Sequence, residues 1–124
     1  MEGGKDPDCR RSFPWDERRW DTGLLAHFKQ LIALRKQYRA LRDGSFKVLF
    51  AQDGVVAVLR QWQDEYIVVV FNRTETARRL DLDTAGLIPD GIVLHDHLNG
   101  SIASTAAGKL GNIRLPPMSG ALLI

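Results

Sequence analysis

The chain has 124 residues, 44% of them hydrophobic and 26% charged, which is an ordinary globular composition and excludes wholesale disorder. No apolar run is long enough for a transmembrane helix, and the first residues lack the order of a signal peptide, so we expect no membrane partner. The formal net charge of +2 is too small to indicate a polyanion, and no nucleic-acid-binding motif accompanies it.

The first segment, residues 1 to about 20, contains turn-forming and aromatic residues without any periodicity. Gly-Gly and Asp-Pro forbid a regular helix here, so we expect a loop. Its single cysteine, Cys9, cannot form an internal disulfide, which is compatible with a cytoplasmic protein. Arg10 and Arg11 would favour its thiolate, but no histidine base is near in the sequence, and we interpret Cys9 as structural.

An amphipathic helix is predicted next, capped at its start by Asp21 or Thr22 and ended at Gly44, where a left-handed cap is expected. Its apolar residues follow the spacing of one buried helix face. This apolar stripe consists of Leu24, Leu25, Phe28, Leu31, Ile32 and Leu34. The stripe must be covered, either by the rest of the chain or by a larger body to which the helix belongs.

From Ser45 onward the pattern changes to that of β-strands. Turn signals at Asp53-Gly54, Asp64-Glu65 and Asn99-Gly100 separate short apolar runs. The predicted strands are FKVLFA, VVAVLRQW, YIVVVFN, ARRLDLD, GIVLHDHL, NIRL and GALLI. No helix interrupts them, which predicts an antiparallel sandwich or barrel of roughly six to eight strands.

Several side chains could bind ligands. Trp15, Trp20 and Trp62 could stack on sugar rings, although we favour packing for Trp15 and Trp20. His95 and His97 stand two residues apart on one strand, but no third ligand is near, and we expect no metal. The charged strand ARRLDLD is interpreted as a solvated face or as a protected sheet edge.

Four stretches of the sequence resemble the last part of an α-amylase superfamily enzyme of glycoside hydrolase family 13. They are EGGKDPDCRRSFPW, LIALRKQYRALRDGSFKVL, VVVFNRT and LPPMSGALLI. The likeness is to the branch of neopullulanases, cyclomaltodextrinases and maltogenic amylases. It implies a mainly β chain, in which residues 1–43 are the terminal loop and helix of a (β/α)8 barrel and residues 44–124 are a Greek-key C-terminal β-sandwich.

The resemblance also implies a binding role for two residues of the opening loop. Asp6 and Arg10 match positions whose side chains hydrogen-bond glucose hydroxyls at the non-reducing end of a bound dextrin. The alternative is that these two side chains pair with each other and shape the loop. By the same resemblance the rest of the barrel would precede this loop, and Met1 would be an internal methionine used as a start, which we state as a hypothesis.

The catalytic residues of a retaining glycosidase are two carboxyl groups on a rigid scaffold, and by resemblance they lie upstream of this chain. His95-Asp96 imitates a family motif, but Leu94 stands where that motif has asparagine. We therefore predict no catalytic residue, no cofactor and no activity for the isolated chain. Maltodextrin would be bound only in the intact enzyme.

The prediction is thus a C-terminal fragment of an α-glucan hydrolase, acting on maltodextrins, cyclodextrins or pullulan, whose sandwich packs against the rest of the barrel. In isolation the helix stripe would be exposed, or would be hidden by formation of a homodimer. A stand-alone carbohydrate-binding β-sandwich is the alternative, and an interaction protein that uses its basic helix is a third class.

Overall fold

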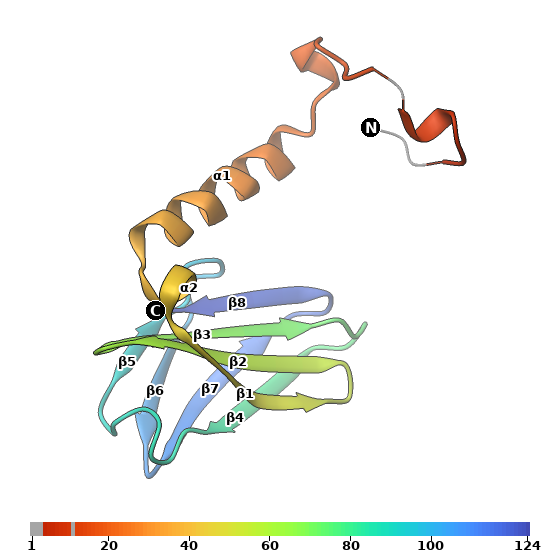
Figure 1. Cartoon of the computed structure of the whole chain (residues 1–124). Helices are drawn as coiled ribbons and strands as arrows, with labels where there is room; N and C mark the ends of the chain where they lie inside the picture. The colour runs from red at the N-terminus through yellow and green to blue at the C-terminus, as the bar shows by residue number, and fades with distance from the viewer. Residues whose placement is uncertain (1–3, 11) are drawn as a thin grey trace. The chain divides into compact units, whose positions relative to one another are not determined.

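The computed structural model describes residues 4–10 and 12–124. The residues outside this part are Met1, Glu2, Gly3 and Arg11, and the hypothesis about Met1 therefore lies outside the described residues. Contacts divide the chain into two units, Met1–Leu34 and Arg35–Ile124, which are described separately below. Figure 1 shows the complete chain with its elements. Nowhere in the described part is there a helix with both the length and the apolar character needed to cross a membrane.

The first unit contains the opening loop and most of helix α1. Two short 3-10 helices, η1 (Asp8–Arg10) and η2 (Glu17–Arg19), interrupt the predicted loop. Helix α1 spans Thr22–Gln37 and continues past the boundary of the unit. Of the two predicted N-caps, Asp21 is the one that caps α1. Its Oδ1 accepts a hydrogen bond of 2.9 Å from the Leu24 amide.

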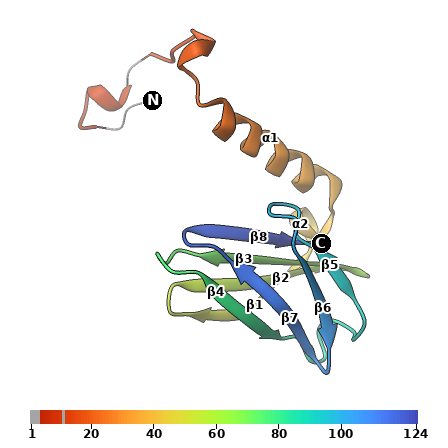
Figure 2. The same cartoon turned by 180° about the vertical axis from the view of Figure 1, so that it is seen from behind.

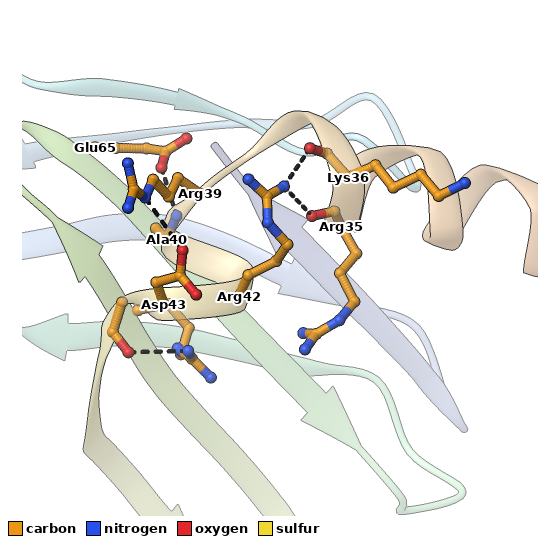
Figure 3. A network of polar contacts seen from close by, with 9 residues as sticks. Arg35, Lys36, Arg39, Ala40, Arg42, Asp43 and Glu65 are labelled. Carbon is orange, nitrogen blue, oxygen red and sulfur yellow. Dashed lines mark hydrogen bonds and ion pairs between the residues drawn. The ribbon is translucent and has the colours of Figure 1, made fainter.

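The predicted single helix is in fact two helices, since α1 ends at Gln37 and a separate helix α2 spans Ala40–Asp43. In an uninterrupted helix the Ala40 amide would donate to the Lys36 carbonyl. Here it donates instead to the Glu65 carboxylate at 2.6 Å. The freed carbonyls of Arg35 and Lys36 accept hydrogen bonds from the Arg42 guanidinium (Figure 3). Side chains therefore replace the backbone bonds that the break removes.

Gly44 ends α2 as predicted, but not in the left-handed conformation. Its φ of −68° and ψ of 158° are extended, so that prediction was wrong. A glycine is needed here for another reason: an added Cβ would overlap the Ala40 carbonyl oxygen and lie 2.8 Å from the Gln61 carbonyl oxygen. The close approach of α2 to strand β2 excludes a side chain at this position.

The second unit is a sandwich of two antiparallel four-stranded sheets, which confirms the predicted architecture (Figures 1 and 2). The first sheet has the order β1-β2-β3-β8 and the second the order β4-β7-β6-β5. The strands are β1 (Ser45–Gln52), β2 (Val55–Trp62), β3 (Glu65–Asn72), β4 (Arg78–Asp83), β5 (Val93–His95), β6 (Ile102–Ala106), β7 (Lys109–Leu115) and β8 (Ser119–Leu123). In the second sheet β5, β6 and β7 follow one another, and β4 lies beside β7, which is a Greek key.

Turn chemistry fixes the register of the first two hairpins. The turn predicted at Asp53-Gly54 is confirmed, and both residues have positive φ, of 49° and 74°, as a type I′ turn requires. The next turn consists of Gln63 and Asp64, one residue earlier than predicted, because Trp62 pairs with Glu65 and that residue already belongs to β3. A strand over Ile102–Ala106 was not predicted.

The core lies between the two sheets, and the described residues that form it all belong to the second unit. The alternation along the strands predicts it well, since Val55, Ala57 and Leu59 of β2 point inward and are buried. Its buried members are Val55, Ala57, Leu59, Val68, Val70, Leu82, Ile88, Leu94, Ala103, Leu110, Ile113, Leu115, Ala121 and Leu123.

Candidate functional site

The structure brings the two predicted substrate-binding residues together. Within one turn, the Arg10 guanidinium donates to both carboxylate oxygens of Asp6, with an Nε–Oδ1 distance of 2.5 Å. Both side chains are well exposed, and an exposed ion pair of this kind stabilises a fold by about 0–1 kcal/mol. The pairing alternative is therefore present in the structure. Contact with glucose hydroxyls stays a prediction.

Cys9 lies beside this pair. Its thiol is exposed, and its Sγ is 4.0 Å from Asp6 Oδ1, a weak contact that helps to hold the turn. This contact fits the structural interpretation of Cys9.

Aromatic residues of the first unit form a cluster around Phe13. Its ring lies 5.0 Å from that of Trp15 and 5.7 Å from that of Trp20. Trp20 also donates a hydrogen bond of 2.6 Å to the Pro14 carbonyl, so the packing role predicted for it is supported. Trp15 is 82% exposed, so the packing role expected for it has little support beyond its contact with the Phe13 ring.

An open groove of about 440 Å³ runs between this cluster and the start of α1. Apolar side chains provide most of its wall, including Leu24 and Phe28 of the predicted stripe. Phe28 is 55% exposed and Ile32 is 51% exposed. The groove lies within Met1–Leu34 and is lined by Phe13, Pro14, Arg19, Trp20, Asp21, Leu24, Leu25 and Phe28.

The two outer faces of the sandwich differ in chemistry. On the first sheet, Val56 and Phe71 are cross-strand partners, and both are exposed. Phe46 and Val48 of the edge strand β1 extend this apolar face. The neighbour of Phe71 on β8 is Gly120, and an added Cβ there would stand 3.3 Å from the phenyl ring.

The second sheet presents charges along β4 and β7, while Val93 of β5 and Ile102 of β6 are exposed apolar residues. Arg79 of β4 and Arg114 of β7 are cross-strand partners, and both are exposed. Asp81 on the same edge strand accepts a hydrogen bond from the Asn112 amide. Because β4 is an edge of its sheet, the interpretation of ARRLDLD as a charged edge is confirmed.

The junction between α2 and the first sheet is a polar network (Figure 3). Besides the Glu65–Ala40 hydrogen bond, Arg39 forms an ion pair of 3.1 Å with Asp43. The Arg39 guanidinium also lies 4.4 Å from the centre of the Trp62 ring, a cation–π distance. One face of Trp62 is thereby occupied, which leaves it poorly placed to stack on a sugar.

Asp96 is a structural anchor, although the sequence only marked it as a catalytic look-alike. It is 3% exposed, and its carboxylate accepts hydrogen bonds from the amides of Leu98 and Leu122. The side chains of Asn99 and Ser101 donate to its other oxygen. The carboxylate thus ties the turn after β5 to strand β8.

These contacts also determine the ionisation of Asp96. Burial acts to raise its pKa. Hydrogen bonds from the Asn99 side chain and from the amides of Leu98 and Leu122 act in the opposite direction, and the resulting pKa is below the usual value. The side chain is therefore a carboxylate at neutral pH, which suits an acceptor of several N–H groups.

Within the described part of the chain, His95 and His97 belong to no cluster of three or more potential metal ligands. The ring of His97 meets that of Tyr38 edge-on, with the ring centres 5.9 Å apart. His95 pairs through its backbone with Ile124.

A second cavity, of about 590 Å³, lies at one end of the sandwich and was not predicted from the sequence. Tyr66 and Gln61 contribute to its wall from the first sheet, and the segment Ala85–Asp90 contributes from the second. The only signal in the sequence was a run of turn residues, Gly86, Pro89 and Gly91, which predicts a loop without predicting a site.

Comparison with known proteins gives a consistent set of relatives. Residues 46–123 match the family described as neopullulanase-like, C-terminal domain. An amylopullulanase of Thermoanaerobacterium saccharolyticum is 33% identical over all of this chain, which covers 10% of that protein. A cyclomaltodextrinase of Geobacillus thermopakistaniensis is 42% identical over 66% of the chain and 14% of its own length.

A solved structure supports the same relationship. The crystal structure of an Anoxybacillus α-amylase matches 99% of this chain with a TM-score of 0.86 at 28% identity. The chain covers 26% of that protein. In each of these comparisons the chain spans only a small part of its relative.

Proposed function

This chain belongs to the neopullulanase-like C-terminal domain family, found in enzymes of glycoside hydrolase family 13, and from that premise we propose that it serves as the structural end of a longer α-glucan hydrolase. The parent enzyme would cleave α-1,4 linkages, and in some cases α-1,6 linkages, in maltodextrins, cyclodextrins or pullulan. It would use double displacement between two carboxyl groups that this chain does not supply.

The observation that carries this proposal is the exposed apolar stripe of α1. A surface helix needs a partner for its apolar face, and Leu24, Phe28 and Ile32 are all exposed. We propose that the barrel of the parent enzyme covers this stripe and the groove beside it. The length of the relatives supports that partner, because this chain covers 10% to 26% of the relatives described above.

The apolar outer face of the first sheet is a second candidate for contact with the barrel. Helix α2 already packs on β2 and β3 of this sheet, and Ala40 is completely buried there. The exposed Phe46, Val56 and Phe71 extend the same face. The charged side of the second sheet, on β4 and β7, would stay in solvent.

For the opening loop we propose that Asp6 and Arg10 act in the parent enzyme as a preformed hydrogen-bonding pair for glucose hydroxyls. Their bidentate contact orients the guanidinium fork before any sugar arrives, which lowers the entropy lost on binding. We also propose a cytoplasmic location, in which the free thiol of Cys9 stays reduced.

The proposal is tested by mapping the native product. Tryptic peptides from an extract of the source organism should place this sequence at the end of a polypeptide several times longer than 124 residues. The purified long protein should hydrolyse maltodextrin, and the 124-residue chain should not. Hydrolysis by the short chain, or a native product of its own size, would refute the proposal.

A further inference from the structure

The end cavity of the sandwich has the features of a built binding site. It lies between the turn end of the β2–β3 hairpin and the connection from β4 to β5. Gln61 and Tyr66 are cross-strand partners, so their side chains enter the cavity from neighbouring strands. Opposite them lies the segment Ala85–Asp90, with Gly108 from the turn between β6 and β7.

The segment that forms this wall is held in place by hydrogen bonds. The Thr84 carbonyl accepts the amides of Leu87 and Ile88, at 3.0 and 3.1 Å. The Thr105 hydroxyl donates to the Pro89 carbonyl at 2.7 Å. Since the wall is fixed before a ligand arrives, binding does not have to order it.

The polar groups in the cavity point to an uncharged ligand rich in hydroxyl groups. Asp90 uses Oδ1 to accept the Gly108 amide, and Gln61 uses its Nε2 to donate to Gln63. Among residues 4–10 and 12–124, Asp90 Oδ2, Gln61 Oε1 and the Tyr66 hydroxyl have no partner. Two acceptors and a phenol hydroxyl suit sugar hydroxyls, which both donate and accept.

The remaining lining also agrees with a sugar. The lining residues that the structure describes include no cationic side chain, so an anionic ligand such as a phosphate would meet only the Asp90 charge. Leu87 and Pro89 offer apolar surface beside the Tyr66 ring, and the C–H faces of a sugar ring can pack against such surface. The volume of about 590 Å³ is in the usual range for ligand sites.

We propose that this cavity binds a short stretch of neutral oligosaccharide and that the oligosaccharide is an α-1,4-glucan. The choice of an α-glucan rests on the proposed function, whereas the exclusion of an anionic ligand rests on the cavity alone. Asp90 and Gln61 accept hydrogen bonds from the sugar, and Tyr66 contributes its ring and its hydroxyl. The sandwich would then hold substrate as well as support the barrel.

Amide NMR titration of the complete 124-residue chain with maltoheptaose tests the inference. Saturable shifts are expected at Gln61, Tyr66, Gly86, Asp90 and Gly108. The variant Tyr66→Phe keeps the ring against the core and removes one hydroxyl, so affinity should fall about three- to tenfold. Asp90→Asn replaces an acceptor oxygen with a donor and should weaken binding about tenfold.

The matched control is Asp81→Asn. Asp81 is also exposed and also accepts one backbone amide, that of Asn112, but it does not line the cavity. Its substitution should leave the affinity unchanged. An equal loss in Asp81→Asn and Asp90→Asn would overturn the assignment, as would the absence of shifts at the cavity up to about 10 mM sugar.

A parallel titration with cellohexaose separates the two proposals. Shifts at the cavity with maltoheptaose only support both. Shifts with cellohexaose only would overturn the α-glucan assignment and would count against the proposed function. If the native protein is a long maltodextrin hydrolase but neither sugar shifts the amide signals at the cavity, this inference is overturned and the proposed function stands.

Discussion

Residues 35–124 bury one set of apolar side chains in a common core, although Phe46 and Phe71 are exposed on an outer face. In residues 4–34 most of the apolar side chains that the structure describes are exposed. Leu110 of β7 has no exposed surface, while Phe28 of α1 is 55% exposed. Both residues follow the regular spacing of their elements, period two in the strand and one helix face in α1. The difference is that Leu110 has a second sheet opposite to it.

This contrast shows that amphipathic spacing predicts which face of an element must be buried, but not which other element will bury it. In the second unit the chain supplies both halves of its core, because two sheets pack face to face. In the first unit only one half of an apolar contact is present. We therefore expect the sandwich to fold by itself. We also expect the exposed stripe of α1 to contribute almost nothing to the free energy of unfolding of this chain.

The largest expected effect is in the core. Leu110→Ala should reduce the free energy of unfolding by about 2–5 kcal/mol, since it leaves a cavity in a packed interior. Phe28→Ala removes a larger side chain but should change the free energy of unfolding by less than about 0.5 kcal/mol. Urea unfolding followed by circular dichroism measures both. Equal losses would abolish the distinction between the two units.

The next effect concerns Asp96, the buried anchor of the second unit. Asp96→Ala leaves the buried Leu122 amide without its acceptor and should destabilise the fold by about 2–3 kcal/mol. The variant Asp83→Ala is the control, because Asp83 is exposed and accepts only the Ala85 amide. It should lose less than about 1 kcal/mol, and a loss as large as that of Asp96→Ala would argue against a special role for burial.

Asp96 also makes stability depend on pH. Its pKa in the folded protein is lower than the unfolded value of about 3.9, so the carboxylate favours folding above about pH 4. This contribution is lost as the pH falls through the folded-state pKa. The difference in unfolding free energy between the wild type and Asp96→Asn should therefore shrink between pH 7 and pH 3. A difference that is independent of pH would show that Asp96 is not the titrating group.

A smaller effect is expected at the junction of α2 with the first sheet. Glu65→Ala leaves the buried Ala40 amide without an acceptor and should lower the free energy of unfolding by about 1–2 kcal/mol. Glu65→Gln keeps an amide oxygen in the same place and should recover most of this loss. Failure of Gln to rescue would assign the effect to charge, and the explanation of the helix break would need revision.

Substitutions on the apolar stripe of α1 should have the smallest effect on stability, but they should clearly affect association. Charging two exposed positions with Leu24→Glu and Phe28→Glu should leave the unfolding of the sandwich unchanged to within about 0.5 kcal/mol. The same change should reduce binding of a hydrophobic dye, with the apolar face of the first sheet still available, and should abolish any dimer seen by light scattering that forms through the stripe. A chain that is already monomeric and binds no dye before substitution would contradict the proposed exposed interface.

Local features of the fold were predictable because their causes are neighbours in the sequence. The Asp21 cap acts on the amide three residues later, and Asp53-Gly54 makes its turn from two adjacent residues with positive φ. Period-two alternation identified most of the strands, but it missed β6. That strand carries small and polar residues, Ala103 to Thr105, whose apolar contrast is weak.

The sequence by itself thus determined the sandwich class, the family, and the start and apolar stripe of the helix, but not its division into α1 and α2. Tertiary structure decided the rest. Glu65 reaches the Ala40 amide across 25 residues, at the break between α1 and α2, and Asp96 reaches the Leu122 amide across 26 residues. The end cavity likewise joins Gln61, Asp90 and Gly108. Such contacts depend on which strands lie next to one another in the fold, and the periodic pattern along the sequence does not predict strand neighbours.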